Sequence, residues 1–231
     1  MGRPVERRIT NGEIEIREHN GKAVIEGHAA VFNTLSQNLG GFVESIAPGA
    51  FKKTIQEADI RALFNHDESL VLGRNRSGTL DLAEDNTGLY YRIQPPDTTY
   101  ARDLMKVLER GDVSQSSFAF QTIDDEWGLT QQDFPQRTLL EVKLYDVSPV
   151  TFPAYTDTDS SVSRAAALAR LAKRSGIAVT DLGDIDAIKR AIRPDQQPKD
   201  TPPDSKSTVD RWAKRAAMLA TMERVLIDVP D

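Results

Sequence analysis

A serine, a histidine and an aspartate in this chain have the residue types of a serine hydrolase site. Ser117 lies in residues 114–120, where small polar and aromatic residues alternate as in a strand with one buried face. If Phe118 and Phe120 are buried, Ser117 is held rigidly on the opposite face. A serine hydroxyl is a poor nucleophile at neutral pH, so it needs a nearby base and a third group that orients that base.

His66 and Asp146 are the candidates for the base and the third group. His66 ends a predicted strand, where the strand fixes its position and the following loop gives access. Asp146 lies among apolar residues on a strand, and a carboxylate there needs a partner. That partner is His66, an arginine or backbone amides. These residues alone fit a serine hydrolase and a non-catalytic β-barrel binding module equally well.

Three further residues are fallback candidates for the same roles. Ser114 and Ser116 are alternative nucleophiles, and Glu141 is the alternative third member. Glu141 lies an odd number of residues from Asp146, so on a regular strand the two side chains face opposite ways. Only one of these carboxylates can therefore point at the site.

Composition excludes several other classes of function. The 231 residues have a net charge of -6, which disfavours a nucleic-acid-binding protein. Cysteine is absent, so disulfides, thiolate metal sites and a cysteine nucleophile are excluded. The three histidines, His19, His28 and His66, lie in contexts too different for one metal site, so we expect no metal. No apolar run has the length of a membrane span and no signal peptide is visible. We therefore expect an intracellular protein that does not associate with a membrane.

The order of short strands and turns predicts an α+β fold. It would be a closed or strongly curled, mainly antiparallel β-barrel with flanking helices. The predicted strands cover residues 13–18, 23–27, 29–33, 59–66, 71–74, 79–82, 89–93, 114–120 and 139–155, the last as one strand or two in series. Residues 124–136 read as a polar excursion between the last two.

Helical patterns flank these strands. A short helix is expected after Pro48, and a longer one runs from about Asp97 to Gly111 and covers one face of the barrel. Towards the C terminus, residues 161–174 and 184–193 are expected to be helical. Residues 194–207 contain no hydrophobic residue and read as a flexible linker, and residues 208–226 as an amphipathic helix.

Six segments, in this order, resemble motifs of the prohead maturation serine proteases of tailed bacteriophages. The resemblance covers roughly residues 10–164, and this family is related in fold to the herpesvirus assemblins. The segments are residues 27–33, 46–51, 63–67, 72–74, 117–120 and 145–155.

The resemblance implies roles for individual residues. The histidine of the family's Phe-Asn-His-Asp motif falls on His66, and the serine of its Ser-Phe-Gly-Phe motif falls on Ser117. The family's glutamate before Val-Ser is replaced here by Asp146, and the motif glycine by Ala119. By analogy with assemblins, residues 151–155 would lie near the oxyanion site.

The function implied is that of a serine endopeptidase packaged inside the phage prohead in the host cytoplasm. It would cleave scaffolding segments of the major capsid protein and also itself, without a metal or organic cofactor, and assemblin relatives suggest a homodimer. The domains expected are residues 1–164 for the protease, 165–193 for a helical extension, 194–207 for the linker and 208–231 for a C-terminal helix that binds scaffold or capsid protein. The alternatives are a catalytically inactive assembly factor on the same fold, to which Ala119 and Asp146 point, and an esterase, for which no Gly-x-Ser-x-Gly motif exists.

Overall fold

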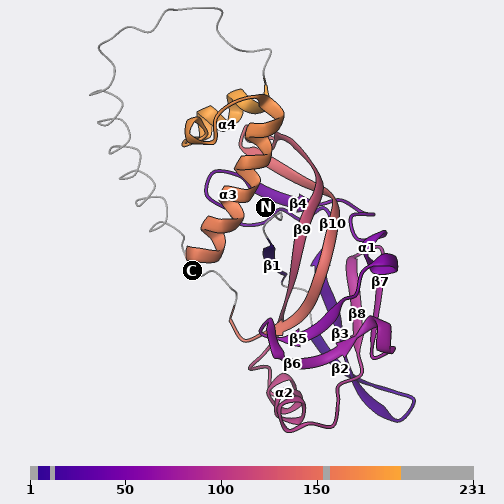
Figure 1. Cartoon of the computed structure of the whole chain (residues 1–231). Helices are drawn as coiled ribbons and strands as arrows, with labels where there is room; N and C mark the ends of the chain where they lie inside the picture. Colours follow the sequence, from indigo (N-terminus) through magenta and orange to yellow (C-terminus); the bar gives the residue numbers. More distant parts are fainter. Residues whose placement is uncertain (1–4, 11–13, 153–156, 194–231) are drawn as a thin grey trace, which may run out of the picture. The chain divides into compact units, whose positions relative to one another are not determined.

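A computed structural model of the chain describes residues 5–10, 14–152 and 157–193, without the side chains of 157–163. Its strands form two sheets (Figure 1). The six-stranded sheet has the order β1-β9-β10-β5-β6, with β4 also paired to β10. Its strands are β1 (Glu6–Thr10), β4 (Val43–Ile46), β5 (Arg61–Phe64), β6 (Asp67–Arg74), β9 (Gln115–Leu129) and β10 (Pro135–Val150).

The second sheet has four antiparallel strands in the order β2-β3-β8-β7. Its strands are β2 (Ile14–His19), β3 (Lys22–Val31), β7 (Leu80–Glu84) and β8 (Gly88–Ile93). The α-helices are α1 (Thr54–Glu57), α2 (Thr99–Glu109), α3 (Asp157–Ser175) and α4 (Ile185–Ile192). Short 3-10 turns lie at η1 (Asn75–Ser77) and η2 (Val179–Asp181).

The α+β class is confirmed, but the closed barrel is wrong for the described strands. β10 pairs antiparallel with β9 along one edge. Along its other edge it pairs in parallel with both β4 and β5, so the six-stranded sheet is mixed. Among the described strands, none of one sheet pairs with a strand of the other, so the two sheets do not close into one barrel.

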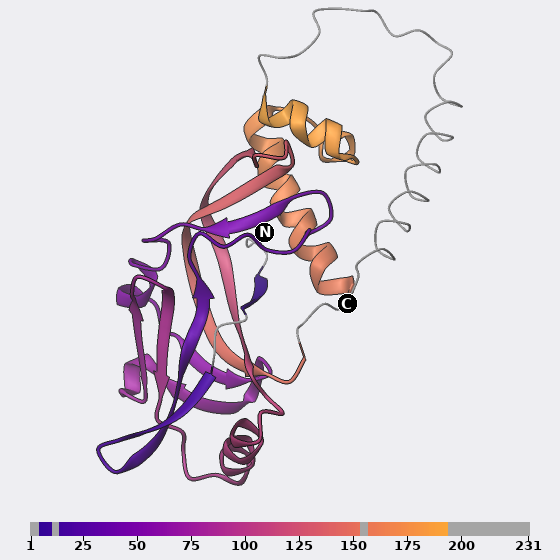
Figure 2. The same ribbon diagram turned by 180° about the vertical axis from the view of Figure 1, so that it is seen from behind.

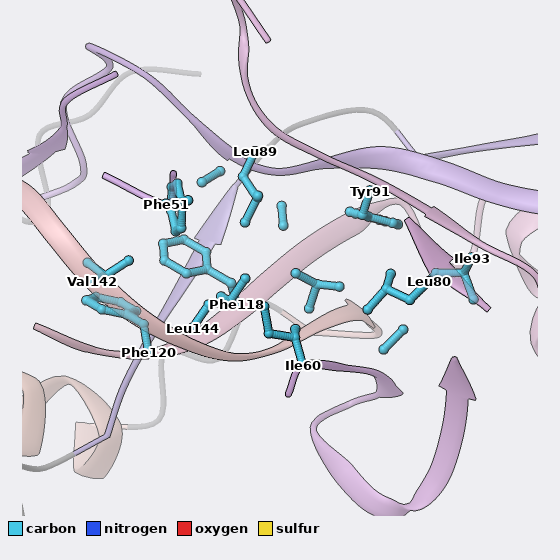
Figure 3. Close-up of a cluster of buried hydrophobic side chains, with 14 of the residues drawn as sticks. Phe51, Ile60, Leu80, Leu89, Tyr91, Ile93, Phe118, Phe120, Val142 and Leu144 are labelled. Atoms are coloured by element: carbon cyan, nitrogen blue, oxygen red, sulfur yellow. The ribbon is translucent and has the colours of Figure 1, made fainter. Parts of the chain in front are cut away.

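One hydrophobic core joins the two sheets (Figure 3). Phe118 of β9 has its ring 5.5 Å from that of Phe51 and 4.9 Å from that of Phe120. Leu89 and Tyr91 of β8 bring the second sheet into the same cluster. This aromatic packing holds one face of β9 rigidly, as the alternating pattern predicts.

The polar excursion expected at residues 124–136 is wrong, because β9 and β10 continue through it as a long hairpin. The reason lies in partners distant in sequence: the buried carboxylate of Asp125 accepts hydrogen bonds from Arg137 and Arg170. Trp127 packs on Phe42, with ring centroids 5.0 Å apart, and on the α3–α4 cluster. A polar strand is therefore stabilised by side chains that no local pattern reveals.

The predicted helices are found at α1 to α4, and Gly111 and Gly176 follow α2 and α3 with positive φ. α2 packs on β2 and β6 and leads into β9 (Figure 2). β1 and β4 were not expected as strands. The boundary expected after residue 164 falls inside α3, and the predictions for residues 153–155 and 194–231 lie outside the described residues. No helix in the described part of the chain is long and apolar enough to cross a membrane.

Candidate active site

Ser117 lies on β9 between two strands of the six-stranded sheet. Its register partner on β10 is Ser148, and its partner on β1 is Ile9. Asp146 pairs with Ala119, two residues further along β9. Since side chains alternate along strands, Ser117, Asp146 and Ser148 share the face opposite Phe118.

His66 reaches this face from a tight turn rather than from a strand. β5 ends at Phe64 and β6 begins at Asp67, so Asn65 and His66 form a two-residue hairpin loop. Their φ angles are 55° and 57°. Two residues with positive φ are what a type I′ turn requires, and glycine is usually preferred at the second of them. His66 takes that place, which is an unfavourable backbone conformation for a residue with a Cβ.

The three expected side chains meet in one hydrogen-bonded chain. Nε2 of His66 lies 2.7 Å from Oγ of Ser117, and Nδ1 lies 2.6 Å from Oδ1 of Asp146. With the proton on Nδ1 donated to the carboxylate, Nε2 is left to accept the serine proton. All three side chains are largely buried.

Two residues that sequence reasoning left out hold this arrangement. The hydroxyl of Ser148 donates to Oδ1 of Asp146 at 2.8 Å. Ser148 lies two residues after Asp146 on the same strand, so the sequence alone places the two side chains on one face. The amide group of Asn65 donates to Oγ1 of Thr151 and accepts from the backbone N–H of Thr151, which ties the turn to the end of β10.

The structure separates the fallback candidates from the site. Glu141 accepts from Lys53 at 3.2 Å on the exposed surface. The hydroxyl of Ser116 lies 2.8 Å from the Tyr91 hydroxyl, on the core side of β9. Ser114 is exposed and precedes β9.

The two departures from the family pattern are accommodated. Asp146 still reaches the imidazole of His66, despite being shorter than glutamate. Ala119 is not among the residues with positive φ, so the alanine causes no backbone strain at this position. Neither departure therefore disrupts the hydrogen-bonded arrangement of Ser117, His66 and Asp146.

The other two histidines lie in other parts of the fold. His28 pairs with Asp85 at 2.8 Å, away from Ser117, and His19 ends β2. Among the described residues, no group of three or more histidine, aspartate or glutamate side chains could hold a metal ion.

A buried network of charges is centred on Arg137 and includes Glu6 of β1. Its guanidinium binds the carboxylates of Glu6, Glu44 and Asp125 at 2.8–2.9 Å. Burial raises the pKa of Glu6, but the charges of Arg137 and Arg8 outweigh burial and hold that pKa below its ordinary value. The pKa of Asp125 is also lowered, because hydrogen bonds and charge from Arg170 and Arg137 outweigh its burial. The carboxylates of Glu6 and Asp125 are thus kept charged in the interior by guanidinium groups.

A hydroxyl, an imidazole and a carboxylate linked in this order have the geometry used by serine hydrolases. The sequence matches the Caudovirus prohead serine protease family over residues 11–171, so the chain belongs to this family. It is a serine protease, a hydrolase, that acts in phage head maturation.

Among solved structures, the chain is similar to the capsid assembly protease of bacteriophage T4. That structure is 14% identical in sequence and has a TM-score of 0.44, with 64% of this chain and 98% of that chain covered. No curated protein sequence matches the chain.

Proposed function

We propose that Ser117 is the nucleophile, His66 the general base and Asp146 the group that orients the imidazole. The observation that carries this assignment is the pair of hydrogen bonds that His66 makes, through Nδ1 to the carboxylate of Asp146 and through Nε2 with the hydroxyl of Ser117. Family membership supports peptide hydrolysis as the reaction.

In the proposed mechanism, Nε2 of His66 takes the hydroxyl proton as Oγ of Ser117 attacks the peptide carbonyl. Asp146 stabilises the resulting imidazolium, which then gives the proton to the leaving amine. Water attacks the acyl-enzyme, again with His66 as base, and releases the acid. Backbone N–H groups hold the oxyanion. Residues 151–155 remain the proposed neighbourhood of the oxyanion, although 153–155 lie outside the described residues and the N–H of Thr151 donates to Asn65.

The proposed substrates are the scaffolding segment of the major capsid protein and the chain itself, inside a prohead assembled in the host cytoplasm. Membership in a prohead protease family supports this choice. In the same proposal, residues 208–226 bind scaffold or capsid protein and recruit the enzyme. If a chain truncated near residue 194 were packaged normally, this recruiting role would be wrong.

The experiment compares the wild-type chain with Ser117→Ala and Asp146→Asn, each co-expressed with the capsid protein of the same phage. We expect Ser117→Ala to stop both cleavage, read by intact-mass spectrometry, and labelling by a fluorophosphonate. Asp146→Asn should slow labelling by about 10³–10⁴-fold, because the imidazole loses its orienting carboxylate.

The matched controls are Ser114→Ala and Glu141→Gln, which make the same chemical changes away from the site. Both should cleave and be labelled like wild type. Cleavage that persists in Ser117→Ala, or an equal loss in Glu141→Gln, would contradict the assignment.

A further inference from the structure

Strand β1 lies along the edge of the strand that carries the nucleophile. Ser117 is 0% exposed, so no substrate carbonyl can reach Oγ until a neighbouring segment moves. β9 has two neighbours, and β10 carries Asp146, so it must stay. β1 pairs antiparallel with the other edge of β9, with Ile9 opposite Ser117, and it precedes the residues 11–171 that match the family.

The backbone of β1 also competes for the serine proton. Oγ of Ser117 donates to the carbonyl oxygen of Arg8 at 3.0 Å, while Nε2 of His66 lies 2.7 Å from the same oxygen atom of the serine. One hydroxyl proton cannot serve both acceptors. The carbonyl of an extended peptide thus already lies beside the nucleophile.

Two side chains of β1 fill a charged pocket next to this carbonyl. Glu6 binds Arg137 at 2.9 Å and Thr122 at 2.6 Å, and only 2% of Glu6 is exposed. Arg8, two residues on and on the same face, binds Glu44 at 2.7 Å. The strand contributes one anion and one cation, so its departure leaves the net charge of the pocket unchanged.

We propose that the edge of β9 held by β1 is the substrate-binding edge, and that β1 occupies it as an intramolecular substitute. A substrate then pairs with β9 as an extended strand and places an acidic side chain against Arg137 and Thr122. This acidic residue lies two positions before the residue whose carbonyl faces Ser117. The residue with that carbonyl corresponds to Arg8, and Glu44 favours a basic side chain there. The inference rests on the proposed function for the role of Ser117 as nucleophile. Binding of the peptide to β9 does not require catalysis.

Addition of a strand to a sheet edge uses both the backbone and the side chains of the added peptide. An added strand gains affinity from main-chain hydrogen bonds, and pockets for alternate side chains give specificity. A strand in the same chain competes at an effective concentration in the millimolar range. Weakening β1 should therefore strengthen the binding of a separate peptide.

The first test measures binding in the full chain carrying Ser117→Ala. A fluorescent peptide with the sequence of residues 4–12 is titrated against this chain with and without Glu6→Lys, which puts a cation against Arg137 and releases β1. We expect the peptide to bind about tenfold more tightly to the chain with Glu6→Lys than to the chain without it. A peptide in which Gln replaces Glu should bind the Glu6→Lys chain about tenfold more weakly than the original peptide does. Glu18→Lys, the same change on an exposed strand residue, should have no effect.

A second variant guards against a folding defect in Glu6→Lys. Ile9→Pro removes an N–H from β1 without touching the charged pocket, and it should release the edge in the same way. Equal affinity for the Glu and Gln peptides, no binding, or the same affinity in Glu6→Lys and Glu18→Lys overturns the inference.

The second test measures the rate of fluorophosphonate labelling with Ser117 intact. Glu6→Lys and Ile9→Pro should be labelled at least about tenfold faster than wild type, and Glu18→Lys at the wild-type rate. If the peptides bind as expected but no variant is labelled, the proposed function fails and the binding edge stands. If wild type is labelled as fast as the released variants, β1 is not a cover and the inference fails.

Discussion

At the scale of single residues, His66 combines a functional side chain with an unfavourable backbone. Its φ of 57° places it in the left-handed region, which costs about 1–3 kcal/mol for a residue with a Cβ. The hydrogen bonds to Asp146 and Ser117 offset this strain. The position therefore favours glycine for stability and histidine for chemistry.

This conflict can be measured with two inactive variants. Neither His66→Gly nor His66→Ala has an imidazole, so neither should be labelled by a fluorophosphonate. His66→Gly should be more stable than His66→Ala by about 1 kcal/mol, because only glycine is unstrained at this φ. Urea denaturation gives the difference. At an ordinary strand position alanine is the more stable of the two, so the reverse order would show that the turn is not strained.

At the scale of elements, the β9–β10 hairpin depends on charges inside it. The lowered pKa values of Glu6 and Asp125 mean that the unfolded chain binds more protons as the pH falls through about 4. Stability from these carboxylates is therefore complete above their unfolded pKa values and is lost as the pH falls through their folded ones.

Replacing Asp125 should separate this contribution from general acid effects. We expect Asp125→Asn to lower the free energy of unfolding at pH 7 by about 3 kcal/mol, since Arg137 and Arg170 lose a buried partner. The variant should also lose less stability than wild type between pH 5 and pH 3, as measured by urea denaturation. Asp103→Asn, an exposed change on α2, should follow wild type at both pH values.

The second sheet has a steric requirement at the start of β8. A Cβ at Gly88 would lie 1.9 Å from the carbonyl oxygen of Ala30 on β3. Gly88→Ala should therefore destabilise the fold by at least about 2 kcal/mol, because backbone must move. Gly128 has nothing within 4 Å of such a Cβ, so Gly128→Ala is the control. A thermal melt in which the two variants unfold together would contradict the close packing.

At the scale of the whole molecule, local patterns predicted most elements, but they did not predict the pairing. Phe118 and Phe120 reveal the buried face of β9 because their alternation is a property of neighbours in sequence. β1 was missed because Glu6 and Arg8 are charged, and only Arg137 and Glu44, far along the chain, make them suitable for burial. The two-sheet arrangement was missed for the same reason, since the choice of β4 and β5 as partners of β10 is a long-range event.

The members of the site come from distant parts of the chain: His66 is 51 residues from Ser117 and 80 from Asp146. Contacts of such separation form only when the whole sheet has formed. We expect the loss of fluorophosphonate labelling and the loss of tertiary structure to share one urea midpoint. Labelling that disappears well before unfolding would instead show a site that opens locally.

The same separation affects the chain while it is being synthesised. A growing chain that has not reached Asp146 already contains Ser117 and His66, yet on the proposed mechanism it lacks the carboxylate that orients the base. On that mechanism, nascent chains and fragments that end before Asp146 lack a complete site. The order of residues along the gene thus delays proteolytic competence until translation has passed the end of the catalytic fold.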